Sequence, residues 1–496
     1  MMRRTSPLSF PVIVLGLAAA LMLLPAGHAA VARDFAVGRA FLYSAVILAL
    51  LALMIGLAMA NRRNRLSPRG HLSVLVLTYA VLPLALALPV VQILPGLSLW
   101  QAWFEMLSSF TTTGATLFAP QDLPHTLHLW RALIGWLGGF HTVVMAIAVL
   151  APQNLVGIEM SSGRTLKAGT TGLAQIDRIA DPGERIRYFA TMLFPAYGGL
   201  TLVLWVGLLL AGDSGLVALC HAMATLSTSG ISPIGGTAQA ASGMAGEALI
   251  LGFLLVAVSR RVLPAVAGLE RQIGRHDPEA LTAGAITLIA VLAVAVTQGF
   301  GSGEAMLPVI WGAVFTCVSF LTTTGFVSAD WGGAGASGGP HTPGLLLLAL
   351  ALIGGGVATT AGGVKLLRVY ALFRHGQREL ERLIEPSSVG GRGMAARQLR
   401  NEGAYVAWIF FVLFAVLIGA VTALLTLQDV ALEPALVLAL AALTNAGPLA
   451  EAAGSGLSVW AELTAGQQTV LAAAMVLGRL EMLAVLAFLT PDQWRR

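Results

Sequence analysis

The sequence predicts an all-α polytopic membrane protein. Hydrophobic residues make up 57% of the 496 positions and charged residues 11%, which is about half the charge of a typical soluble domain. The apolar residues are gathered into long segments, and four short polar phrases recur between them. Together these observations predict two leader helices plus four helix–pore-helix–helix repeats in a pseudo-fourfold arrangement around one pore.

Ten segments are long and apolar enough to cross a membrane, for which about 20 mostly apolar residues are needed. They are Leu8–Leu24, Val37–Met59, Leu72–Leu94, Leu129–Leu150, Phe189–Ala211, Gly246–Val266, Leu281–Gln298, Gly344–Leu372, Tyr405–Leu427 and Gln468–Leu489. Four shorter apolar segments lie between pairs of these spans: Leu99–Phe110, Gly215–Leu226, Met306–Leu321 and Leu432–Leu443. We expect re-entrant half-helices there, since a membrane tolerates such segments where they line a cavity enclosed by protein.

The basic residues indicate the orientation of these spans. All but four of the 29 Lys and Arg residues fall in the termini and loops on one side; the exceptions are Arg33, Arg39, Arg131 and Arg479. This side, with both termini, is predicted to be cytoplasmic, so the half-helices enter from outside. The first 30 residues also have the pattern of a cleavable secretory signal, and charge counting does not separate that alternative from an uncleaved helix.

Each half-helix leads into a short phrase rich in hydroxyl groups that ends in glycine. The candidate ion-binding residues are Thr112, Thr113, Gly114, Thr228, Ser229, Gly230, Thr323, Thr324, Gly325, Asn445, Ala446 and Gly447. We expect glycine to permit the sharp turn that directs backbone carbonyls inwards, with the hydroxyls adding ligands or bracing the turn. The C-terminal end of a half-helix carries partial negative charge, which favours a cation.

The chemistry of these phrases favours one class of ion. They contain no carboxylate, and neutral oxygens suit a weakly hydrated monovalent cation better than calcium. One such phrase is ordinarily a turn, but four at matching positions indicate a repeated unit.

A glycine-rich break interrupts the span Gly344–Leu372. It contains Gly354, Gly355, Gly356, Gly362 and Gly363. Each glycine destabilises a helix by about 1 kcal/mol, so we expect the helix to break into a flexible loop, the alternative being close helix packing. Lys365 follows the break, and we hypothesise that its charge contributes to closure. Arg479 in the last span either has a structural partner or faces the pore as an electrostatic barrier.

Other polar residues favour no enzyme chemistry. Glu105 either attracts cations or hydrogen-bonds to the scaffold of the first phrase, and His221 is expected to satisfy a local hydrogen bond. Cys220 and Cys317 lie in apolar stretches without a disulfide or metal spacing. The basic segment Arg374–Arg400 is a solvated loop, or it meets a partner or anionic membrane lipid. The net charge follows from membrane orientation and does not indicate nucleic-acid binding.

Several motifs resemble those of the Trk/Ktr/HKT superfamily of potassium transporters, in particular its TrkH branch. They are Trp103–Thr116, Leu129–Gly139, His221–Ser232, Thr322–Asp330, Gly354–Arg368, Thr444–Pro448 and Gly478–Glu481. The resemblance runs nearly end to end, and it implies the membrane subunit of a potassium uptake system in the bacterial inner membrane. It also implies an uncleaved two-helix leader and a gating role for the loop at the glycine-rich break.

The resemblance further implies a homodimer above a cytoplasmic ring of TrkA-like regulatory subunits. Nucleotide (NAD or ATP/ADP) is then expected only on that partner, because this chain lacks a phosphate-binding glycine loop after a strand. The chain itself is expected to bind no cofactor, with the potassium ion as its substrate.

These expectations divide the chain into seven regions. They are the leader pair 1–70, repeat 1 at 71–152, a cytoplasmic linker at 153–186, repeat 2 at 187–270, repeat 3 with its broken second helix at 271–385, a second linker at 386–400 and repeat 4 at 401–496.

Two alternatives remain for the function. Ser229 stands where the family usually has glycine, so a sodium-permeable or poorly selective member is one alternative. An ion-coupled secondary transporter is the other, because broken helices and repeats also fit that class.

Overall fold

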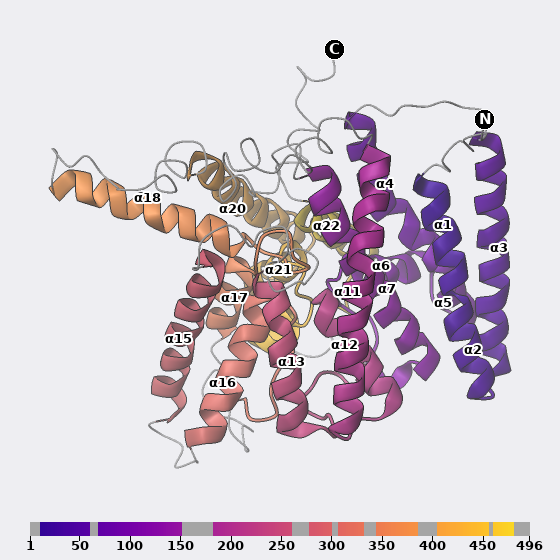
Figure 1. Cartoon of the computed structure of the whole chain (residues 1–496), viewed down its shortest axis with the longest axis horizontal. Coiled ribbons are helices and arrows are strands. Elements are labelled where there is room, and N and C mark those ends of the chain that lie inside the picture. Colours follow the sequence, from indigo (N-terminus) through magenta and orange to yellow (C-terminus); the bar gives the residue numbers. More distant parts are fainter. Residues whose placement is uncertain are drawn as a thin grey trace.

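The computed structural model describes residues 10–59, 68–150, 182–259, 277–299, 306–331, 344–384, 404–455 and 460–480, and every regular element in these ranges is a helix. The leader helices are α1 (Phe10–Leu21), α2 (Leu23–Val31) and α3 (Phe35–Met59). They pack on one another at one side of the molecule, away from the helices of repeat 3 (Figure 1).

Four repeats follow the leader. Repeat 1 contains α4 (Pro68–Leu86), α5 (Leu88–Ile93), α6 (Leu99–Phe110) and α7 (His125–Met145); repeat 2 contains α11 (Pro182–Leu210), α12 (Gly215–Ser227) and α13 (Gly243–Val258). Repeat 3 contains α15 (Pro278–Gly299), α16 (Met306–Leu321), α17 (Gly344–Ile353) and α18 (Leu366–Ile384), and repeat 4 contains α20 (Ala404–Thr426), α21 (Leu432–Leu443) and α22 (Ala465–Arg479). Pro120–Asp122 forms a short 3-10 helix, and Ala146–Leu150 and Glu451–Ser455 form π-helical turns.

The predicted half-helices are confirmed almost to the residue. Three of them, α6, α16 and α21, have the predicted bounds, and α12 is one residue longer. The start of α6 is fixed by a capping box, in which Ser98 and Gln101 exchange side-chain and backbone hydrogen bonds. The C-terminal halves of all four are buried, whereas outer helices such as α3 and α20 expose many large apolar side chains. This burial is what a half-helix inside a membrane protein requires.

Within the described residues, seven helical segments are long and apolar enough to cross a membrane, and they coincide with seven of the ten predicted spans. The predicted span Gly344–Leu372 is broken as expected, because α17 ends at Ile353 and α18 begins at Leu366. The other two predicted spans correspond to α13 and α22, which the structure describes to residues 259 and 480.

Beyond the break, α18 leaves the bundle sideways and extends past its neighbours α15 and α20 (Figure 1). Glu481, the linker 386–400 and residues 153–181 of the first linker lie outside the described residues, as do most of the basic loop residues. The proposed domain boundaries therefore stay predictions.

Candidate functional site

All four polar phrases begin with the same turn. We call them loop 1 (111–114), loop 2 (227–230), loop 3 (322–325) and loop 4 (444–447). The N–H of the second residue donates to the carbonyl three residues back, and that of the third donates to the carbonyl five residues back. The second residues are Thr112, Thr228, Thr323 and Asn445, with φ of +56°, +52°, +57° and +54°. This is the Schellman motif, in which glycine usually holds the left-handed position.

In loops 1 to 3 a pair of hydroxyl groups spans the turn. The Oγ atoms of the first and third residues are 2.9 Å apart in loop 1, 3.0 Å in loop 2 and 3.1 Å in loop 3. In each of these loops the first hydroxyl also donates to the carbonyl four residues back in its half-helix. These hydroxyls therefore brace the turn. The hydroxyl of Ser229 braces loop 2 in the same way as that of Thr113 braces loop 1.

The last residue of each loop lies against the next loop. A Cβ atom added to each glycine would clash with an atom of its neighbour: Gly114 with the carbonyl oxygen of Ser229, Gly230 with that of Thr324, Gly325 with the ring of Pro448, and Gly447 with the carbonyl oxygen of Thr113. The contacts run from loop 1 through loops 2, 3 and 4 and back to loop 1. The four loops thus form a closed cycle, as expected of four repeats around one axis.

The reason for glycine differs at one of these positions. Gly114, Gly230 and Gly325 have φ of +74°, +63° and +84°, as expected where the backbone is left-handed. Gly447 does not have a positive φ, so the expectation of a left-handed glycine is wrong there. Its N–H donates to the carbonyl oxygen of Thr113 at 2.6 Å, and glycine is needed because this packing leaves no room for a Cβ.

Loop 4 is held differently from the other three. Its third residue is Ala446, so the hydroxyl pair is missing and Thr444 donates only to its own half-helix. Instead, the amide of Asn445 donates to Thr113 Oγ1 at 3.1 Å and to the carbonyl of Met475 in α22 at 2.9 Å. Asparagine suits this place because it tolerates a left-handed backbone and carries two N–H donors.

The outer side of loop 1 contains a buried ion pair. Glu105 in α6 lies 2.6 Å from Arg131 in α7, and its second oxygen accepts from the N–H of Leu117 at 3.0 Å. Glu105 therefore holds the loop scaffold, the second of the two roles considered for it.

Burial raises the pKa of Glu451, which follows loop 4, while the positive charge of Arg131 acts in the opposite direction.

Residues 354–365, which we call the gate loop, connect α17 to α18. The two ends of this loop are paired: Val364 and Lys365 donate to the carbonyls of Leu352 and Ile353, and Leu366 donates to Gly355. Gly354 and Gly363 have φ of +75° and +77°, which supports the prediction that glycine breaks the helix here.

The tip of the gate loop reaches the ends of the half-helices. Thr360 donates through its hydroxyl to the carbonyl of Leu226, directly before loop 2, at 3.1 Å. The N–H of Gly362 donates to Thr323 Oγ1 in loop 3 at 2.7 Å, and a Cβ on Gly362 would overlap the carbonyl oxygen of Thr444 in loop 4. The tip, residues 360–362, is therefore packed against loops 3 and 4 and against the end of α12 directly before loop 2.

Arg479 connects the gate loop to loop 1. One terminal nitrogen donates to the carbonyl of Thr360 at 2.6 Å, and the other donates to the hydroxyl of Thr112. The side chain is 5% exposed, and among the described residues no carboxylate forms an ion pair with it. A buried charge without an ion-pair partner is costly unless other groups stabilise it. The C-terminal end of α6, where Thr112 lies, offers partial negative charge of the required sign.

A cavity of about 30 Å³ lies beside the gate loop, and both Arg479 and Lys365 line it together with Tyr79 and Thr142. The Lys365 amine donates to the carbonyl of Ala361 in the same loop. Lys365 and Arg479 therefore lie on the wall of one cavity, and their part in gating stays a prediction.

Two other anchors of the gate loop were not predicted from the sequence. Glu279, at the start of α15, accepts from the N–H of Val357 at 2.8 Å. The carbonyl of Ala257, at the end of α13, accepts from the N–H of Gly356 at 2.9 Å and from the hydroxyl of Thr359 at 3.1 Å. Glu279 is buried in the structure. The only signal that the sequence offered for it was an acidic residue in the first turn of an apolar helix.

Comparison with known proteins agrees with this architecture. A model of the TrkH family, described as cation transport protein, matches residues 287–493. The Trk system potassium uptake protein TrkH of Salmonella typhimurium is 30% identical over 490 residues, covering 96% of each chain, and that of Escherichia coli is 29% identical with the same coverage. The crystal structure of the potassium transporter TrkH from Vibrio parahaemolyticus superposes with a TM-score of 0.79 over the whole of both chains, at 26% identity.

Proposed function

Because the chain belongs to the TrkH family of cation transport proteins, we propose that it takes up potassium by channel-like permeation through loops 1 to 4. In this proposal the gate loop controls the pathway, and the protein is the membrane subunit of a Trk-type system in the bacterial inner membrane. The relatives reported above are named as potassium uptake proteins, which supports potassium as the substrate.

The closed cycle of the four loops carries this proposal. The carbonyl oxygens of Thr113, Ser229 and Thr324 each lie against the glycine of a neighbouring loop. Backbone oxygens in a ring replace the water shell of a weakly hydrated monovalent cation. Each of the four loops follows the C-terminal end of a half-helix, whose partial negative charge lowers the energy of a cation near it.

In this proposal the gate loop closes the cycle from its inner side. Its tip contacts loops 3 and 4 and the end of α12 before loop 2, and it reaches loop 1 through Arg479. Opening the pathway in this proposal requires those contacts to break while the paired ends of the loop persist. The guanidinium of Arg479 lies where a permeating cation would leave loop 1, so its charge raises the barrier for potassium.

Arg479 and Lys365 thus act together as fixed cations beneath the loops. Both line the same cavity, and none of the described residues that line it with them is acidic. Lys365 bonds within the gate loop, so it moves with the loop, whereas Arg479 on α22 stays with repeat 4. We therefore expect opening to remove both charges from the ion path, Lys365 together with the gate loop and Arg479 by a different movement.

The proposed partners follow from the family. We propose a homodimer that binds a cytoplasmic ring of TrkA-like subunits, on which NAD or ATP/ADP would act, and both termini on the cytoplasmic side. Basic cytoplasmic segments, including the part of Arg374–Arg400 in α18, would contact these subunits or anionic membrane lipid.

Growth rescue tests the function. The chain should restore growth of a potassium-uptake-deficient bacterium at low potassium, with rubidium competing strongly and sodium weakly. Uptake into proteoliposomes driven by a potassium gradient alone would support permeation. A requirement for a proton or sodium gradient would favour the coupled transporter, and equal competition by sodium would favour the poorly selective alternative. Absence of rescue by a protein shown to reach the membrane would contradict the proposal.

A further inference from the structure

One position on the half-helices supplies a second anchor for the segment that follows each loop. It lies six residues before the first residue of the loop, and its occupants are Glu105, His221, Thr316 and Leu438. In repeats 1 to 3 this side chain is polar, buried and hydrogen-bonded to a residue two or three positions after the loop glycine. We call these three side chains the latch residues.

In repeat 1 the latch residue is charged. Glu105 Oε2 accepts from the N–H of Leu117, three residues after Gly114, at 3.0 Å. Its other oxygen forms the buried ion pair with Arg131, so α7 holds the carboxylate in place from the opposite side.

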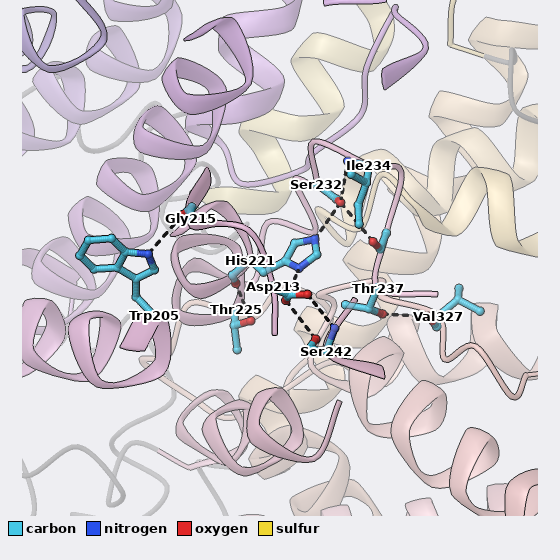
Figure 2. Close-up of polar contacts among 11 residues, drawn as sticks. Trp205, Asp213, Gly215, His221, Thr225, Ser232, Ile234, Thr237, Ser242 and Val327 are labelled. Atoms are coloured by element: carbon cyan, nitrogen blue, oxygen red, sulfur yellow. Dashed lines mark hydrogen bonds and ion pairs between the residues drawn. The ribbon is translucent and has the colours of Figure 1, made fainter. Parts of the chain in front are cut away.

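In repeat 2 the latch residue belongs to a chain of polar side chains, which Figure 2 shows. His221 Nε2 lies 2.8 Å from the hydroxyl of Ser232, two residues after Gly230. The Ser232 hydroxyl also donates to the carbonyl of Gly236 at 3.2 Å, which extends the chain to the segment after loop 2. On the other side of the ring, Nδ1 lies 4.0 Å from Asp213, whose carboxylate accepts twice from Ser242.

In repeat 3 the latch residue is the smallest. Thr316 Oγ1 accepts from the N–H of Ser328, three residues after Gly325, at 3.2 Å. Glu247, on α13 of repeat 2, holds the same segment, because it accepts from the Ser328 hydroxyl and from the N–H of Ala329, both at 2.8 Å. The hydroxyl of Thr237 adds a bond to the carbonyl of Val327 at 2.9 Å, also shown in Figure 2.

Repeat 4 has no latch residue. Leu438 is apolar and 1% exposed. There, loop 4 is held by its bonds to loop 1 and α22 through Asn445 and the N–H of Gly447. The polar latch is therefore a feature of the three loops that carry the hydroxyl pair.

We propose that Glu105, His221 and Thr316 are positioning residues that determine ion selectivity without touching the ion. This inference rests on the proposed potassium pathway. Each of loops 1 to 3 is fixed at its inner end by the Schellman turn and at its outer end by the latch, with only a few residues between. Discrimination between potassium and sodium depends on where the backbone oxygens are held, whether cavity size or ligand field strength dominates.

Thr316→Val gives the cleanest test, since valine keeps the shape and removes the acceptor. Purified protein is reconstituted into proteoliposomes, and uptake of a rubidium tracer, used in place of potassium, is measured in the presence of competing sodium. We expect the potassium-over-sodium preference to fall several-fold in Thr316→Val. In Glu105→Gln the amide oxygen can still accept from Leu117 but the charge that pairs with Arg131 is lost, so we expect a smaller fall. Thr316→Ser, which keeps the hydroxyl, should restore the preference. Leu438→Met is the matched control and should leave the preference unchanged.

The selectivity ratio does not depend on how many molecules are active, so it separates positioning from a loss of folded protein. An unchanged ratio in Thr316→Val and Glu105→Gln would overturn the inference, as would an equal fall in Leu438→Met. If wild-type protein moves neither ion, the proposed function fails instead, and the two failures are thereby distinguished.

Discussion

In loops 1 to 3 each turn is held mainly by bonds to its own half-helix, and loop 4 adds bonds to loop 1 and α22. The tip of the gate loop, in contrast, is held by bonds to other repeats. The same pair of backbone bonds recurs in all four loops, and three loops add the hydroxyl pair. The gate tip depends on single contacts with Leu226, Thr323 and Arg479. A typical hydrogen bond contributes about 1 kcal/mol, so the tip can be released by the loss of a few such contacts.

This difference suggests a division of labour. In the proposed pathway, local and repeated bonds would keep the loops in one geometry, as selectivity requires. Long-range single contacts would allow the gate loop to take a second position when neighbouring helices shift, because each contact breaks independently of the others.

Gly114→Ser should have the largest effect, because it breaks the cycle itself. The new side chain would overlap the carbonyl oxygen of Ser229, and the position has a left-handed backbone. We expect potassium uptake to fall on the order of tenfold or more, as a cost of about 1.4 kcal/mol in the pathway would produce. Gly419→Ser in α20, where an added Cβ meets nothing within 4 Å, is the control. Normal uptake and selectivity in folded Gly114→Ser would remove loop 1 from the ion path.

Arg479→Ala should have the next largest effect, in the opposite direction. It removes the bridge between loop 1 and the gate loop together with a buried charge. We expect several-fold greater tracer flux in proteoliposomes without a regulatory partner. Arg479→Lys keeps the charge but cannot form both hydrogen bonds in the same way, so its flux should lie between that of the wild type and that of Arg479→Ala. Equal or lower flux in well-folded Arg479→Ala would count against the barrier.

Lys365→Ala should raise flux by a smaller factor. Its amine bonds within the gate loop, so its loss removes charge from the cavity without cutting a link to another repeat. The increase should be measured in the same assay, with the thermal midpoint recorded as a check on folding. A folded variant with unchanged flux would show that Lys365 takes no part in closure.

The smallest effect is expected from a matched pair of variants, Thr360→Val in the gate loop and Thr444→Val in loop 4. Each removes one hydroxyl bond, from Thr360 to Leu226 in another repeat and from Thr444 to its own half-helix. Losing about 1 kcal/mol from the closed state should shift its equilibrium about fivefold, so flux should rise in Thr360→Val. Thr444→Val should change flux by less than about twofold, because the backbone bonds of loop 4 remain. Similar changes in the two variants would contradict the proposed division.

The sequence by itself determined the local features of this protein. The lengths of the four short apolar segments predicted half-helices there, since segments of 12 to 16 residues are too short to cross a membrane. The glycine cluster predicted the break between Ile353 and Leu366, because each glycine weakens the helix that contains it. The hydroxyl phrases predicted where the loops lie.

Only the tertiary structure decided which residues meet. Arg479 and Thr112 are 367 positions apart, and Asn445 and Thr113 are 332 apart. No periodicity or composition links such residues, because their contact depends on how four repeats close into a cycle. The same reason explains Gly447: neighbouring sequence suggested a turn like the other three, but the need for glycine comes from the backbone of loop 1 packed against it.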